Sequence, residues 1–118
     1  MSTHGTSAHA ESLSLPTPQP KSTSLNGQLD SFTDIWVSPD GAIEAGVWEC
    51  TAGTFTASRD GYDEVCTIVS GTATVTASDG TVTELSPGSV FVTPAGWTGT
   101  WTLHSTVRKT YVIRTLSS

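Results

Sequence analysis

The chain has 118 residues, a formal net charge of −6 at pH 7 and five lysines and arginines in all. Arg108-Lys109 is the only adjacent basic pair, so the chain cannot neutralise several phosphates, and we expect no nucleic-acid binding. No apolar run reaches the ~18 residues of a membrane helix, and the N-terminus lacks the charged start and apolar stretch of a signal peptide. We therefore expect a cytoplasmic protein with no membrane partner.

Residues 1–30 differ in composition from the rest of the chain. They are rich in Ser, Thr, Pro and Gln, and Pro16, Pro18 and Pro20 exclude both a helix and a central strand. We predict a disordered or extended tail over residues 1–30, with His4 and His9 in solvent, and one domain over residues 31–118. A domain of this size buries only somewhat over ~60% of the surface that its unfolded chain exposes, so we expect a homodimer. The tail's end, from about Leu29 to Trp36, is apolar enough to pair along a sheet edge or with a second subunit.

After Asp30 the sequence becomes a series of short β-branched and aromatic stretches separated by glycine-containing turns. This rhythm is typical of an all-β sandwich or barrel, and no stretch has the periodicity of an amphipathic helix. Asp79-Gly80 predicts a hairpin whose two-residue loop has positive φ angles. The predicted strands are 33–38, 42–51, 54–58, 62–70, 72–78, 81–85, 89–93, 99–104 and 107–116.

Two glycine-anchored spacings carry a family resemblance. Glu64 is followed by Gly71, and Gly88 is followed by Pro94 and Gly96. These positions resemble the two cupin motifs, G(x)5HxH(x)3-4E(x)6G and G(x)5PxG(x)2H(x)3N, over nearly the whole predicted domain. The resemblance implies an all-β double-stranded β-helix, the RmlC-like jelly-roll barrel of the cupins.

The metal-ligand positions of those motifs are changed. The two histidine slots before Glu64 fall on Asp60 or Arg59 and on Ser58 or Ala57, depending on register. The later histidine and asparagine slots hold Gly99 and Leu103, and alternation aims His104 at the opposite face. One carboxylate cannot hold a transition metal, so we predict no metal and no cofactor. The alternative is a metal held by Glu64, Cys66 and Cys50, which we otherwise interpret as a carboxylate and two buried thiols.

Four segments narrow the resemblance within the cupins. They are GVWECTAGTF, YDEVCTIVSGTATVT, PGSVFVTPAGWTGTW and VRKTYVI. They are similar to small single-domain cupins related to the ureidoglycine aminohydrolase cupin domain. This relationship implies a barrel that is often dimeric and has a pocket in its mouth, and it implies no particular reaction here.

Strand alternation orients the candidate site. If Glu64 points inward, so do Cys66 and Ile68, while Trp101 and Leu103 face inward from a later strand. On the last strand, Arg108 and Arg114 share the solvated face, which turns Lys109 toward the lumen. The candidate ligand-binding residues are Trp48, Tyr62, Glu64, Cys66, Trp97, Trp101, Lys109 and Tyr111.

A carboxylate on an apolar inward face is costly, so we expect Glu64 either to pair with Lys109 or to be protonated. The first functional interpretation is a cupin that binds a small polar or nitrogen-containing metabolite without a metal. The second is a metal-independent enzyme in which Glu64 is the catalytic general acid or base. Metal-dependent chemistry and a purely structural or protein-interaction role remain open as further alternatives, and simple core filling by the tryptophans remains an alternative to a pocket.

Overall fold

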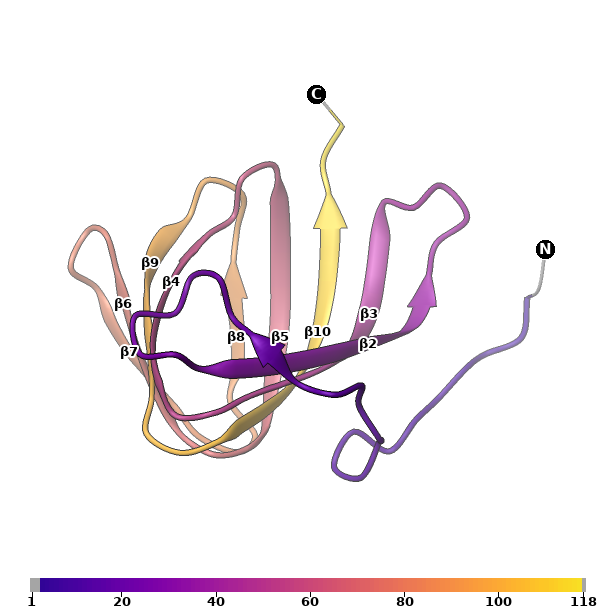
Figure 1. The fold of residues 1–118 in the computed structure, drawn as a ribbon. Helices are drawn as coiled ribbons and strands as arrows, with labels where there is room; N and C mark the ends of the chain where they lie inside the picture. The colour runs from indigo at the N-terminus through magenta and orange to yellow at the C-terminus, as the bar shows by residue number, and fades with distance from the viewer. Residues whose placement is uncertain (1–2, 118) are drawn as a thin grey trace.

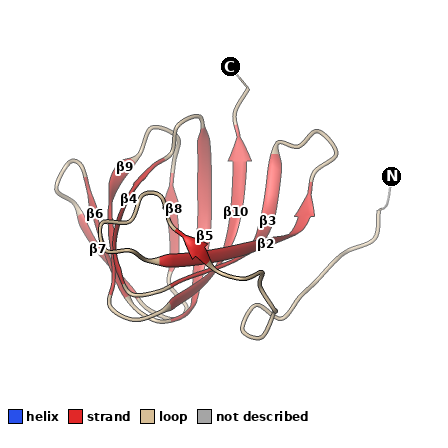
Figure 2. Cartoon of the chain, in the orientation of Figure 1, coloured by secondary structure: helices blue, strands red, loops and turns tan. Residues whose placement is uncertain are grey.

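The computed structural model describes residues 3–117, so residues 1 and 2 of the predicted tail and residue 118 of the predicted domain lie outside the described residues. Over this range the chain is built of strands, turns and loops (Figures 1 and 2). None of its described segments is a helix long and apolar enough to cross a membrane. The strands are β1 (Gln19–Pro20), β2 (Leu29–Val37), β3 (Ile43–Cys50), β4 (Gly53–Ser58), β5 (Tyr62–Ser70), β6 (Ala73–Ala77), β7 (Val82–Leu85), β8 (Val90–Thr93), β9 (Thr98–Leu103) and β10 (Val107–Thr115).

The strands form two antiparallel sheets that face each other as a jelly-roll barrel. The larger sheet has six strands in the order β1-β2-β3-β10-β5-β8, and the smaller has four in the order β4-β9-β6-β7. This is the all-β fold that the sequence predicts. In the larger sheet β10 pairs with β3 on one side and β5 on the other, which places Lys109 opposite Trp48 and Ile68.

Each strand predicted from the sequence is present, and β2 starts at Leu29, where it pairs antiparallel with β3 as expected for the tail's end. The hairpin between β6 and β7 is also present, but the predicted two-residue loop is wrong. The amide of Ala77 donates to Thr81 O and that of Gly80 donates to Ala77 O, which gives a three-residue loop. Gly80 has φ of 91°, and no non-glycine residue in the described chain has positive φ. In this loop, therefore, only position 80 needs the conformational freedom of glycine.

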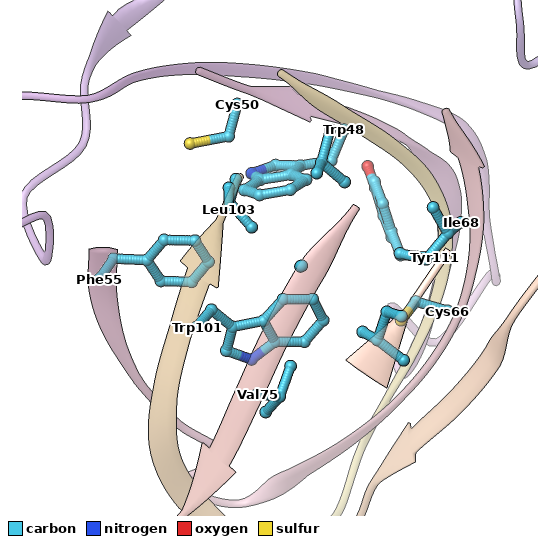
Figure 3. Packing of buried hydrophobic residues seen from close by; sticks show 12 residues of the cluster. Trp48, Cys50, Phe55, Cys66, Ile68, Val75, Trp101, Leu103 and Tyr111 are labelled. Atoms are coloured by element: carbon cyan, nitrogen blue, oxygen red, sulfur yellow. The ribbon is translucent and has the colours of Figure 1, made fainter. Parts of the chain in front are cut away.

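The interior between the sheets contains the inward faces that alternation predicts. Cys66, Ile68, Trp101 and Leu103 are all buried, whereas Val65 is exposed. Figure 3 shows the rings of Trp48, Phe55 and Trp101 gathered between the sheets. Phe55 and Trp101 are stacked with ring centres 6.0 Å apart, and Trp48 meets Phe55 edge-on at 5.9 Å. Aromatic packing of this kind fills the core of a small domain with few residues.

The N-terminal segment, coloured indigo in Figure 1, crosses from one sheet to the other. We call residues 19–28 the strap. At one end of the strap, β1 pairs with β2 in the larger sheet. At the other end, the strap bonds β4: Leu25 N donates to Thr54 O, and Thr56 N donates to Thr23 O. Gln28 is 1% exposed and anchors the strap, because its amide donates to Thr51 O and accepts from Ser24 Oγ. The strap therefore closes one side of the barrel.

Candidate functional site

A cavity of about 400 Å³ opens between the strap, β3, β4, β5 and β10. Aromatic rings and charged side chains of both signs share its lining. Such a mixture of apolar wall and a few convergent polar groups is the general character of small-molecule sites. Its lining residues are Lys21, Thr23, Asp30, Phe32, Glu44, Trp48, Phe55, Thr56, Ala57, Ser58, Arg59, Tyr62, Glu64, Lys109, Tyr111 and Ile113.

The buried carboxylate of Glu64 lines the cavity and is held by two cations. Lys109 Nζ donates to Glu64 Oε1 at 3.0 Å, and Arg59 Nη2 donates to the same oxygen at 3.1 Å. The three side chains are between 6% and 9% exposed, so this is a buried charge cluster. The pairing with Lys109 agrees with one of the two states expected from the sequence.

The two cations decide the protonation state of Glu64. Burial has the largest single effect on the pKa of Glu64 and would raise it. The charges of Lys109 and Arg59, with their hydrogen bonds, act in the opposite direction and together outweigh burial, so the pKa lies below its ordinary value. Glu64 is therefore ionised at neutral pH, and the protonated alternative is wrong.

Arg59 is one of the site residues that sequence reasoning did not select. It directly follows β4, and its backbone is fixed by hydrogen bonds with Gly96 and Trp97. Its Nε donates to Thr93 Oγ1 at 2.8 Å, and its guanidinium lies 5.7 Å from the ring centre of Tyr62. One signal was present in the sequence, because position 59 coincides with a histidine slot of the cupin motif in one register.

The aromatic faces are occupied by lysines of the protein itself. Lys109 Nζ lies 4.6 Å from the ring centres of both Trp48 and Trp101. Lys21 Nζ, which comes from the strap, lies 4.6 Å from the centre of Phe55 and 5.8 Å from that of Trp48. Lys21 also forms a 3.5 Å ion pair with Asp30, whose carboxylate accepts the indole N–H of Trp48 at 3.0 Å. These contacts are cation–π interactions reinforced by a carboxylate.

Tyr111 lies across β3 because Gly46 leaves room for it. A Cβ at Gly46 would stand 2.4 Å from the Tyr111 hydroxyl oxygen and 2.2 Å from Thr33 O. The hydroxyl donates to Asp34 Oδ1 on β2 at 2.6 Å. Burial, followed by this bond to a carboxylate, raises the pKa of Tyr111, so the phenol is neutral and its ring is held in the cavity wall.

The structure places five of the residues predicted for the site around the cavity and three elsewhere. Trp48, Tyr62, Glu64, Lys109 and Tyr111 line it. Cys66 and Trp101 lie in the core, at 2% and 0% exposed, and the indole nitrogen of Trp101 has no hydrogen-bond partner in the described structure. Trp97 is half-buried and packs edge-on against Phe91, with the Arg59 guanidinium 5.9 Å from its ring centre.

The residues around Glu64 do not fit a metal ion. Two cations occupy the positions nearest its carboxylate and would repel a divalent ion. Within residues 3–117, no three His, Cys, Asp or Glu side chains are grouped as metal ligands would be. Burial raises the pKa of Cys66 and raises that of Cys50 to about 11, so both are neutral thiols rather than the thiolates that bind metals. His104 is exposed and contacts Thr74.

Comparison with known families and structures agrees with this architecture. The model of the EutQ-like cupin domain matches residues 37–111, and the chain therefore belongs to this cupin family. None of the curated proteins matches the sequence. The family match leaves out the strap and Lys21.

Solved structures show the same fold at low sequence identity. A DUF861-family protein of unknown function from Pseudomonas syringae pv. tomato aligns with a TM-score of 0.75 and 17% identity, covering 89% of this chain. This chain spans 46% of that protein's length. Ethanolamine utilization protein Q of Salmonella typhimurium aligns at 0.68 and 21% identity, over 85% of this chain and 80% of its own. Ectoine synthase from P. lautus aligns at 0.67 and 14% identity, over 81% and 71%.

Proposed function

We propose that this cupin binds a small polar, nitrogen-containing metabolite in the barrel cavity without a metal. The observation that carries the proposal is the buried cluster of Arg59, Glu64 and Lys109 in the cavity wall. Taking three charges out of water costs several kcal/mol per ion, and well-packed apolar residues would stabilise a core at least as well. Recognition of a polar ligand accounts for keeping such a cluster beside a cavity.

Hydrogen-bond acceptors in the cavity support a ligand that carries nitrogen. Glu44 lines the cavity, and within the described chain its carboxylate has no ion pair or hydrogen bond. Thr23 and Ser58, whose side chains carry hydroxyls, also line the cavity. These groups accept N–H donors, while the rings of Phe32 and Trp48 supply apolar contact. The resemblance to ureidoglycine aminohydrolase cupins supports the same class of ligand.

The enzymatic alternative gains less support from this geometry. A general base needs a pKa near the working pH, and the pKa of Glu64 is lowered rather than raised. The oxygen that would move a proton already accepts two charged donors. We therefore assign Glu64 the role of organising Arg59 and Lys109 for binding.

The test is a titration of protein kept in a metal chelator with a set of small amides, amines, ureas and amino acids. Trp48 forms part of the cavity wall, so a bound ligand changes its fluorescence. We expect at least one compound to bind saturably, and Ala57→Phe, which fills the cavity from β4, to weaken that binding at least tenfold.

Val82→Phe is the matched control, because it adds similar volume at an exposed position on β7 away from the cavity. It should leave binding unchanged, and thermal unfolding checks that both variants are folded. Binding that appears only after a metal is added, or that survives Ala57→Phe, would contradict the proposal.

A further inference from the structure

The strap brings an ammonium group to the cavity from outside the residues that match the family. Lys21 lies in a segment that precedes the family match at residues 37–111, yet its side chain reaches the rings of Phe55 and Trp48. Lys109 approaches the same Trp48 ring from β10. Two lysines from opposite ends of the sequence therefore converge on one indole, and both line the cavity.

These cations have more hydrogen-bond donors than the protein satisfies. A lysine ammonium has three N–H donors and an arginine guanidinium has five. Lys109 uses one donor on Glu64, Lys21 uses one in a long 3.5 Å contact with Asp30, and Arg59 uses Nε and Nη2. The other donors have no acceptor side chain in the described structure. A ligand that supplies negatively charged acceptors therefore fits better than one that supplies further donors.

Charge arithmetic over the three cations and their two carboxylate partners favours a ligand with a single negative charge. Lys21, Lys109 and Arg59 carry three positive charges, and Asp30 and Glu64 balance two of them. The aromatic faces that would attract a cationic ligand are already covered by the two lysines.

A further negative charge lies at the start of β3. Glu44 pairs in register with Ile113 on β10, which also pairs with Glu64 on β5, so the two carboxylates belong to one row of the sheet. Trp48 pairs with Lys109, four residues away from that row, and four residues of extended chain span about 13 Å. Glu44 thus offers an acceptor at a distance from the backbone of Trp48 and Lys109.

We propose that the cavity binds the carboxylate of a nitrogen-bearing carboxylic acid between Lys21 and Lys109, and that Lys21 of the strap contacts this carboxylate directly. This inference rests on the proposed function, because it names the class of ligand for the same cavity. The ligand's N–H groups face Glu44, and its carboxylate contacts the two ammonium groups. The strap is therefore the element that gives this member of the family its preference for acids.

The experiment compares each acid with its amide, which has nearly the same shape and no charge. The probes are N-carbamoylglycine, N-acetylglycine and the amide of each, titrated against the full chain at pH 7 with tryptophan fluorescence as the readout. We expect the acids to bind at least tenfold more tightly than their amides. Lys21→Met should remove most of this preference, and Lys21→Arg should retain it.

Arg114→Met is the matched control. It removes one positive charge, but Arg114 lies on the exposed face of β10, where it pairs with Asp63. The preference for acids should survive this change. A preference that also survives Lys21→Met would overturn the assignment of Lys21.

The outcomes separate this inference from the proposed function. If amides bind as tightly as acids, or if only neutral or cationic compounds of the wider set bind, the carboxylate assignment is overturned and the proposed function stands. If nothing in either set binds, both are overturned.

Discussion

Glu64 holds together a cluster that would be unstable without it. Arg59 and Lys109 both donate to one of its oxygens, and all three side chains are buried. Removing one partner of a buried charge pair leaves the other charges without compensation, which costs far more than losing an exposed pair. The carboxylate is thus as important to the barrel's stability as to the cavity.

We expect Glu64→Gln to lower the free energy of unfolding by about 3 to 5 kcal/mol at pH 7, because Arg59 and Lys109 then face each other without a counterion. The folded-state pKa of Glu64 lies below its ordinary value of 4.5. Its stabilisation is therefore fully present above that pH and is lost as the pH falls through the folded pKa. Urea unfolding of both proteins across a pH series should show their difference narrowing in acid.

Glu84→Gln makes the same chemical change on exposed β7 and should alter stability little at any pH. A difference between wild type and Glu64→Gln that is absent at pH 7, or that widens in acid, would show that Glu64 is not held as a buried anion.

Individual site residues were predictable from the sequence where strand alternation determines their direction. Glu64 and Lys109 lie within long strands whose outward faces carry Val65 and Arg108, so their inward orientation follows from period two. Arg59 lies just beyond the last residue of β4, where alternation no longer applies. Its direction depends on the turn at Gly96 and Trp97, which is distant in sequence.

The same distinction applies to whole segments. The strands of the barrel were predictable because β-branched residues alternate between glycine-containing turns. The strap has no such periodicity, and its position depends on polar bonds to distant residues. Gln28 donates to Thr51 O within the strap's anchor. The segment that precedes the strap is held in the same way, because Arg108 donates to the carbonyl oxygens of Ala10 and Leu13. Composition alone therefore predicted a tail and gave no sign that Lys21 reaches the cavity.

Gln28 should be the main anchor of the strap, because its buried amide joins Ser24 to Thr51. We expect Gln28→Ala to cost about 1 to 3 kcal/mol. Amide exchange should accelerate at Leu25 and Thr56, which bond between strap and β4. Urea unfolding and hydrogen–deuterium exchange measure the two effects.

Gln19→Ala is the control, since that side chain is exposed and makes only a 3.4 Å contact with Thr17 O. Equal protection of the strap amides in wild type and Gln28→Ala would contradict the anchoring role.

The outer face of the larger sheet carries a row of apolar residues in register across five strands, and several of them are exposed. The homodimer expected from the sequence remains a prediction. We propose that its interface is this row, covered by a second copy of the chain. Sedimentation equilibrium should give twice the 12.3 kDa of one chain. The row consists of Trp36, Ala45, Val112, Val65 and Val92.

Val65→Lys, between Val112 and Val92 in this row, should convert the dimer to a monomer, because a buried unpaired ammonium is costly. Val82→Lys places the same charge on exposed β7 in the other sheet and should leave the mass unchanged. A single-chain mass for the wild type at all concentrations would exclude the dimer.

The central place of β10 in the larger sheet also orders events during synthesis. β3 and β5 do not pair with each other, and β10, which contains residues 107–115, lies between them and pairs with both. Until the ribosome has made those residues, the larger sheet lacks its middle strand, and the cavity lacks Lys109 and Tyr111. Arg108, which bonds the carbonyl oxygens of residues 10 and 13, is also absent until then. Residues 10 and 13 are thus made well before Arg108 and wait for it before they can take their final place.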